Sequence, residues 1–294
     1  MQRMVSRHAD LDGPVHYLDF GGDGPPMVCV HGLSGSALNW MAVGPRLAAA
    51  GHRVVALDLR GFGRTPLGRG TRLRDNRRLL DLFLGQVVGG PATLIGNSMG
   101  GLLAVMQAAA HPETVSSLVL VDPALPWRGR RPFDLGLFAF FGAMVPPVAG
   151  EAVLAWGARR WGAETVVAGV LAAVCADPGR LSDDLVRAHV DQEAGRLAWP
   201  RSHRALAQAS RSLLWALGRR GLLATYRQVH APVLIVHGEL DRVVPAAFSR
   251  ALGARLGWHV EVLPGVGHVP MMETPDEFLS LTLGWLASHQ PAAA

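Results

Sequence analysis

The sequence predicts an α/β protein with a mostly parallel central sheet flanked by helices. Short runs rich in Val, Ile and Leu alternate with longer Ala/Leu-rich stretches along most of the 294 residues. Most of the short runs are apolar throughout, which is typical of strands buried on both faces of a sheet. Residues 127–228 lack this alternation and show helical Leu/Ala/Trp periodicity instead.

Apolar runs and turn residues place the predicted elements. His16–Phe20, before a Gly-rich turn, is predicted to be an antiparallel edge strand. A last helix is expected to begin at Thr274, an N-cap candidate followed by Pro275 and two acidic residues. The predicted parallel strands are Met27–Val30, Arg53–Leu59, Ala92–Ile95, Ser117–Val121, Val233–Val236 and Val260–Leu263. The other predicted helices are Leu38–Ala50, Leu73–Val87, Met99–Ala110 and Ala246–Leu256.

The interruption of the alternation suggests the domain organisation. We expect residues 1–126 and 229–294 to form the α/β core, and residues 127–228 to form a helical cap. The cap follows the fourth predicted parallel strand, Ser117–Val121.

Composition excludes several classes of protein. A hydrophobic content of 49% is too high for a disordered chain, and no apolar run reaches the roughly 18 residues of a membrane-spanning helix. The N-terminus does not resemble a signal peptide, and Cys29 and Cys175 are interpreted as small core residues. A cytoplasmic enzyme is therefore expected.

The positive net charge does not indicate a nucleic-acid partner. All 28 basic residues are Arg, and they occur as scattered pairs rather than as a stripe with interleaved aromatic residues. We therefore expect no nucleic-acid binding, and attribute the net charge of +5 mostly to coding bias.

The strongest catalytic signal is Gly96-Asn97-Ser98-Met99-Gly100-Gly101, between a predicted strand and a predicted helix. A nucleophile on such a tight turn has a strained backbone, and the flanking glycines are needed because side chains there would collide. The N-terminus of the helix then directs free N–H groups at the site. We therefore predict that Ser98 is a nucleophile.

A second Gly-rich loop, residues 31–36, follows the predicted strand Met27–Val30. The backbone N–H of Leu33, together with that of Met99, is predicted to form an oxyanion hole. Such donors each contribute about 3 kcal/mol to transition-state stabilisation. His31 is interpreted as a structural residue that orients this loop.

A serine nucleophile requires a base and a group that orients the base. Among the 12 histidines, His268 stands out because it lies in a Gly-rich turn after the last predicted strand. Asp241 follows the preceding strand, so Ser98, Asp241 and His268 all come at carboxyl ends of strands, where open α/β sheets place their sites. Asp122 and Glu239 are alternatives for the acid. We find no metal-ligand spacing, and expect no metal or cofactor.

In these motifs the sequence resembles the α/β-hydrolase superfamily, and within it esterase- and lipase-like serine hydrolases with a helical cap. The resemblance covers nearly the whole chain outside the insertion. It implies the α/β-hydrolase fold, with a mobile cap after the sixth strand of that fold and with Asp58–Gly63 shaping the sheet edge near the pocket. The motifs are His31-Gly32, Asp58-Leu59-Arg60-Gly61-Phe62-Gly63, Gly96-Asn97-Ser98-Met99-Gly100-Gly101, His237-Gly238-Glu239-Leu240-Asp241 and Gly267-His268.

Residues that differ from those of related families narrow the range of expected reactions. Ser98 stands where haloalkane dehalogenases and epoxide hydrolases have Asp. The elbow is similar to that of carbon–carbon bond hydrolases of the meta-cleavage type, but those usually have an aromatic residue where this chain has Val269. Cofactor-free perhydrolases usually have an aromatic residue at the position of Leu33. The sequence favours hydrolysis of a small-molecule carboxylic ester through an acyl-enzyme. A carbon–carbon hydrolase, a perhydrolase and a non-catalytic ligand-binding protein on the same fold stay open as alternatives.

The cap contains an apolar stretch, Leu135–Val148, that is too short to span a bilayer. One interpretation is a helix packed on the core. The other is that one face lines an acyl pocket, which would favour apolar acyl groups. A transient contact of the cap with a lipid surface, and the oligomeric state, are left open. The pocket candidates are Trp127, Phe138, Phe140, Phe141 and Val269.

Overall fold

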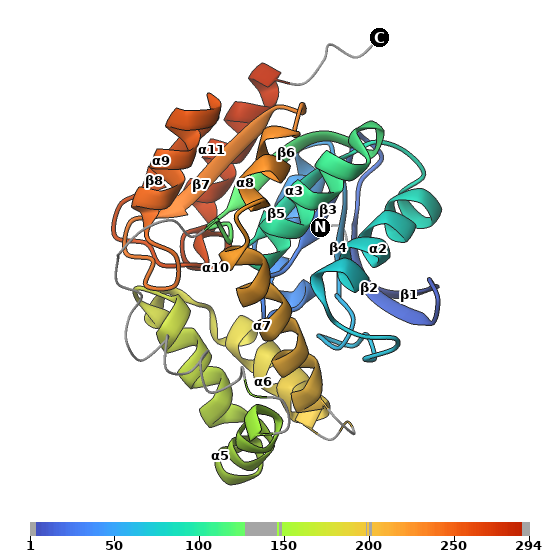
Figure 1. Ribbon diagram of the computed structural model, residues 1–294, viewed down its shortest axis with the longest axis vertical. Helices are drawn as coiled ribbons and strands as arrows, with labels where there is room; N and C mark the ends of the chain where they lie inside the picture. The colour runs from blue at the N-terminus through green and yellow to red at the C-terminus, as the bar shows by residue number, and fades with distance from the viewer. Residues whose placement is uncertain (1–3, 127–145, 147–148, 198, 200–201, 290–294) are drawn as a thin grey trace.

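The computed structural model describes residues 4–126, 146, 149–197, 199 and 202–289. Its strands are β1 (Val5–Asp10), β2 (Pro14–Gly21), β3 (Pro26–Val30), β4 (Arg53–Leu57), β5 (Ala92–Asn97), β6 (Val115–Val121), β7 (Val233–Gly238) and β8 (His259–Leu263). They form one sheet in the order β1-β2-β4-β3-β5-β6-β7-β8 (Figure 1). Strand β2 is antiparallel to β1 and β4, and all other neighbours are parallel. This sheet confirms the predicted fold class.

Helices cover both faces of the sheet (Figure 1). Buried residues of α2 (Leu73–Phe83), α3 (Met99–Ala110), α8 (Leu222–Arg227) and α9 (Ala246–Leu256) share one apolar cluster. Residues of α1 (Gly44–Ala49), α10 (Pro270–Glu273) and α11 (Pro275–His289) share the other. The short helices η1 (Ala37–Trp40), η2 (Leu84–Val88) and η3 (Pro112–Thr114) lie in the connections between these elements.

Alternation along the central strands explains the two clusters. In β3, Val28 and Val30 belong to the first cluster, while Met27 and Cys29 belong to the second. Successive side chains of a strand point to opposite faces, so a strand between two helical layers is apolar at every position. The buried, free Cys29 is one of these core residues, as expected.

Between β6 and β7, every described element is helical. These elements are α5 (Ala149–Val174), η4 (Pro178–Arg180), α6 (Asp183–Leu197), α7 (Ser202–Gly218) and α8. Figure 1 shows α5, α6 and α7 together at one end of the sheet. Helix α5 is interrupted at Gly162, which has φ 70° and ψ 173°.

The structure corrects several predicted elements. Strand β1, which the sequence did not predict, lies at the sheet edge in place of β2; its polar, mostly exposed residues carry no alternating pattern. The predicted helix Leu38–Ala50 is divided into η1 and α1, because Pro45 begins a new helix. The Thr274 hydroxyl has no hydrogen-bond partner among the described residues, so its side chain does not cap α11.

Candidate active site

Ser98 lies on the sharp turn between β5 and α3. Its φ of 52° and ψ of −115° are strained for a residue with a side chain, and such strain is concentrated at functional sites. The neighbouring glycines permit the turn. A Cβ on Gly96 would lie 2.6 Å from the backbone of Gly100, and one on Gly100 would lie 2.2 Å from the carbonyl oxygen of Val30. This is the close packing that the sequence predicted.

The loop after β3 lies directly against Ser98. A Cβ on Gly32 would be 3.1 Å from the Ser98 Cβ. His31 holds the loop, since its Nδ1–H donates to the Gly32 carbonyl at 2.7 Å and its Nε2 accepts from the Leu59 N–H at 3.0 Å. Burial lowers the pKa of His31, which suits this neutral, structural interpretation.

The backbone N–H groups of Leu33 and Met99 have no hydrogen-bond acceptor within the part of the chain that the structure describes. Most buried N–H groups in folded proteins are paired, so the unpaired N–H of buried Met99, next to Ser98, and that of half-buried Leu33 are candidate donors to a ligand oxygen. The free N–H of Met99 is also the positive end of α3.

Asp241 and His268 are brought together by the loops after β7 and β8. His268 Nδ1 lies 2.7 Å from Asp241 Oδ2. The backbone N–H groups of Val243 and Val244 donate to Asp241 Oδ1 at 2.7 and 3.0 Å. Burial opposes ionisation of Asp241, but His268 and the hydrogen bonds from His237 and His268 outweigh it and hold its pKa well below the usual range.

Asn97, which the sequence analysis did not single out, connects Ser98 with the loop that carries His268. Its Nδ2 donates to the carbonyl of Val121 at 3.2 Å and to that of His268 at 3.0 Å. Within the described residues, the Ser98 hydroxyl and His268 Nε2 are not hydrogen-bonded to each other. Such bonds are often long in free enzymes and tighten when substrate binds.

Within the described structure, neither alternative for the acid has a hydrogen bond or an ion pair with His268. Asp122 is fully buried after β6, and its Oδ1 accepts from the Gly238 N–H at 2.8 Å. Glu239 accepts instead from the exposed backbone N–H of Gly265 at 3.1 Å. The geometry therefore favours Asp241.

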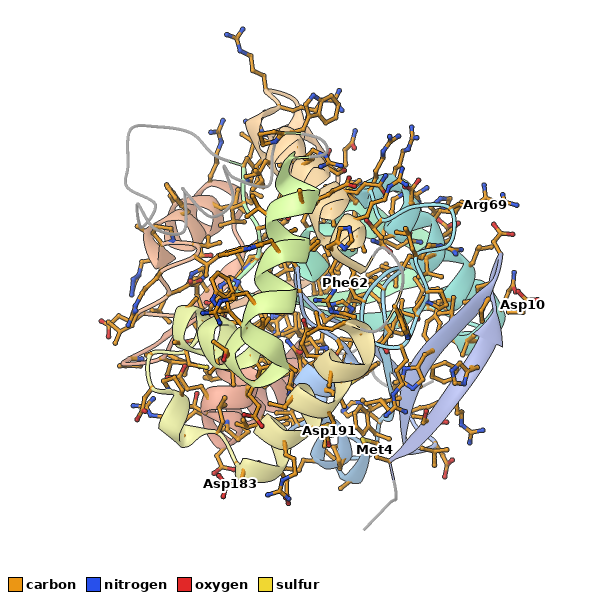
Figure 2. All side chains as sticks on the ribbon, turned by 90° about the horizontal axis from the view of Figure 1, so that it is seen from below. Met4, Asp10, Phe62, Arg69, Asp183 and Asp191 are labelled. Atoms are coloured by element: carbon orange, nitrogen blue, oxygen red, sulfur yellow. The ribbon has the colours of Figure 1, made fainter. Side chains whose placement is uncertain are left out.

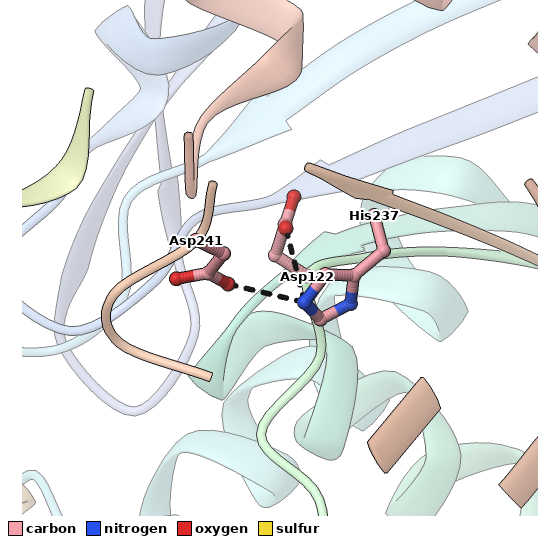
Figure 3. Close-up of side chains that lie close together, drawn as sticks. All are labelled: Asp122, His237 and Asp241. Atoms are coloured by element: carbon pink, nitrogen blue, oxygen red, sulfur yellow. Dashed lines mark ion pairs between the residues drawn. The ribbon is translucent and has the colours of Figure 1, made fainter. Parts of the chain in front are cut away.

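His237 lies between the two buried aspartates (Figure 3). Its Nε2 is 3.2 Å from Asp241 Oδ2 and 3.4 Å from Asp122 Oδ1. Ligand atoms of these three residues lie within 4.8 Å of one another, close enough to share a metal ion. However, His237 Nε2 also faces the Val244 carbonyl oxygen at 2.7 Å. A carbonyl only accepts, so this nitrogen carries a hydrogen and has no lone pair for a metal.

Glu273 joins the end of α5 to the loop that carries His268. This buried carboxylate accepts from the N–H groups of Ala176 at 3.0 Å, Asp177 at 3.2 Å and Gly267 at 3.1 Å. In addition, the His268 N–H donates to the Val174 carbonyl at 2.6 Å. No local pattern predicts this network, because the end of α5 is far along the chain from Glu273 and the loop that carries His268.

Of the pocket candidates, Trp127, Phe138, Phe140 and Phe141 lie outside the described residues. Val269 is buried in the second apolar cluster. A cavity of about 350 Å³ lies beside α6. Its lining includes Met4 and Asp191, the two residues labelled near it in Figure 2. Its lining includes Leu38 and Trp199 and does not include the three candidate catalytic residues.

Comparison with known proteins shows the family of this chain. Residues 27–281 match the family model described as "Alpha/beta hydrolase family". The chain is 31% identical over 276 residues to the monoacylglycerol lipase of Mycolicibacterium smegmatis, covering 90% of this chain and 88% of that protein. It is 28% identical over 299 residues to the 2-hydroxy-6-oxo-6-(2'-aminophenyl)hexa-2,4-dienoic acid hydrolase of Metapseudomonas resinovorans, covering 96% and 91%.

The fold is also similar to solved structures. The 2-hydroxy-6-oxo-6-phenylhexa-2,4-dienoate hydrolase of Rhodococcus sp. strain RHA1 superposes with a TM-score of 0.74 at 22% identity, covering 97% of this chain and 99% of that chain. The fold and the family match place the protein among the hydrolases built on a parallel sheet with a strained turn after β5. The chain belongs to the alpha/beta hydrolase family. No helix among the described residues has the length and apolarity needed to cross a membrane.

Proposed function

We propose that this protein is a serine hydrolase that cleaves carboxylic esters through an acyl-enzyme. The observation that carries the proposal is the strained backbone of Ser98, beside two free N–H groups and the buried Asp241–His268 pair. The similarity to monoacylglycerol lipase, whose name describes an ester hydrolase, supports the same reaction.

In this mechanism His268 removes the Ser98 proton as Ser98 Oγ attacks the ester carbonyl. The N–H groups of Leu33 and Met99 bind the oxyanion of the tetrahedral intermediate. His268 then protonates the leaving alcohol, and later takes a proton from the water that releases the acid. Asp241 orients the imidazole and stabilises its charged form.

Labelling with a fluorophosphonate probe tests the proposal. The native protein should react, whereas Ser98→Ala should not. Ser34→Ala is the matched control, because Ser34 lies in the neighbouring loop with a similar φ of 65°. Failure of the folded native protein to react would refute a serine hydrolase and favour the non-catalytic alternative.

Hydrolysis of a carbon–carbon bond is the second candidate. Similarity to the dienoic acid hydrolase over 96% of the chain supports it, while Val269 after His268 argues against it. A dienone substrate and a nitrophenyl ester distinguish the two reactions. Faster turnover of the dienone would favour the second candidate.

The acyl preference is a further part of the proposal. The apolar stretch Leu135–Val148 supports a pocket for medium-length chains, since burying each such side chain or methylene releases free energy. We expect kcat/KM for nitrophenyl esters to rise from acetate to hexanoate or octanoate, and Phe140→Asp or Phe141→Asp to flatten this trend. A steady fall from acetate onward would refute an apolar pocket.

A further inference from the structure

Two buried residues outside the proposed catalytic set adjoin the proposed acid. Asp122 follows β6, His237 belongs to β7, and both side chains are fully buried (Figure 3). Asp122 has a φ of 45°, which residues with side chains seldom adopt. Strain therefore occurs at a second position of the site, at the residue whose carboxyl group approaches Asp241.

The two aspartates differ in the number of donors that they receive. Asp241 accepts from two backbone N–H groups at Oδ1, while both imidazoles contact its Oδ2. Asp122 Oδ1 accepts from one backbone N–H, and its Oδ2 has no hydrogen-bond partner among the described residues. Two neighbouring buried carboxyl groups do not both ionise readily, and the charge goes to the better solvated one. That group is Asp241.

His237 is held at both ring nitrogens. Its Nε2 carries a hydrogen, because the Val244 carbonyl oxygen lies 2.7 Å away. Its Nδ1 is paired with the Ser249 hydroxyl of α9 at 2.7 Å. The ring nitrogen that donates to Val244 also lies 3.2 Å from the same Asp241 oxygen that His268 contacts, so its one N–H faces two acceptors.

We propose that Asp122 and His237 are positioning residues for the acid Asp241, an inference that rests on the proposed function. Asp122 is a neutral carboxylic acid, and His237 shares its Nε2–H between the Val244 carbonyl and Asp241. Asp241 alone then carries the negative charge that orients His268. Among the described residues, the titratable group that faces this pair is Asp241. Burial and the Asp241 charge hold the pKa of Asp122 well above its ordinary value, which agrees with this distribution of protons.

Isotope-edited infrared spectroscopy of aspartate-labelled protein at pH 8 tests the state of Asp122. The folded wild type should show the C=O band of a protonated carboxyl group, and Asp122→Asn should lack it. Asn keeps the carbonyl oxygen for the Gly238 N–H and tolerates a positive φ. If this variant does not fold, Asp122→Gly, which suits the same φ, takes its place. A wild type without the band would overturn the inference.

Two variants of His237 test the positioning role. His237→Phe removes the donor to Asp241, whereas the amide of His237→Gln restores an N–H there. Without the donor, the Asp241 charge acts more strongly on His268. The acidic limb of the kcat/KM profile should therefore move to higher pH. Gln should reverse most of this movement. Reduced activity with an unmoved acidic limb would indicate packing alone and overturn the proposal.

The readouts separate this inference from the proposed function. A protein that shows the carboxyl band, which Asp122→Asn lacks, yet fails to react with the fluorophosphonate, would overturn the proposed function while the charge distribution stands. A labelled, active protein without the band would overturn the inference and leave the proposed function.

Discussion

Replacing Asp122 with Asn should change how stability depends on pH. In the folded protein the pKa of Asp122 is raised, chiefly by burial and further by Asp241, so the group keeps its proton above the ordinary aspartate pKa of about 3.9. The unfolded chain releases that proton. Unfolding therefore releases a proton above about pH 4, and this group makes the wild-type free energy of unfolding fall as pH rises.

Asn does not titrate, so position 122 no longer makes the free energy of unfolding fall as pH rises. The free energy of unfolding of Asp122→Asn, minus that of the wild type, should rise with pH above about pH 4, by at most about 1.4 kcal/mol per pH unit. The rise ends where pH passes the folded-state pKa of Asp122. Urea unfolding at pH 5, 6 and 7 measures it, provided that both proteins have equal m-values.

A second variant separates titration from packing. Asp122→Gly fits the φ of 45° but loses the contact with the Gly238 N–H. The free energy of unfolding of Asp122→Gly, minus that of the wild type, should rise with pH at the same slope as for Asp122→Asn. The two differences should be separated by a constant amount. A difference that stays flat with pH in both variants would show that Asp122 is ionised in the folded protein, and would refute the reasoning.

Three further predictions concern the site and its supports. Asp241→Asn should lower kcat by about 10⁴, as the equivalent change does in serine proteases, while its circular dichroism spectrum stays unchanged. Asp122→Asn should lower kcat far less. A larger loss of kcat in Asp122→Asn than in Asp241→Asn would assign the role of the acid to the residue after β6. Gly100→Ala should prevent folding or fluorophosphonate labelling, because its Cβ would lie 2.2 Å from the Val30 oxygen. By contrast Gly284→Ala, in open space on α11, should raise stability in urea by about 0.5 to 1 kcal/mol. Glu273→Gln should lower the free energy of unfolding by about 2 kcal/mol and should also reduce kcat. An unchanged kcat would show that the position of the His268 loop does not depend on this carboxylate.

The sequence predicted the parts of the molecule that local patterns determine. Helix α3 begins and ends where predicted, because the Gly-rich turn before it and Pro112 after it are strong local signals. The approach of Asp241 to His268 could also be expected, since both follow neighbouring strands of a parallel sheet. Their roles in catalysis stay predictions.

The parts that were missed depend on distant segments. His237 was interpreted as a structural residue, and its place between Asp122 and Asp241 becomes visible only when β6 and β7 are paired. Strand β1 is stabilised by pairing with β2 rather than by an apolar face, so its composition resembles a loop.

The hydrogen bonds between Glu273 and the residues after α5 have a consequence for protein engineering. A chimaera that exchanges the predicted cap, residues 127–228, for that of a relative would also replace the segment after α5. That exchange would take from the buried Glu273 carboxylate the N–H groups of Ala176 and Asp177, and from the His268 N–H the carbonyl of Val174, unless the relative has the same backbone there. The transplanted module should therefore retain the segment of this chain from Val174 to Arg180.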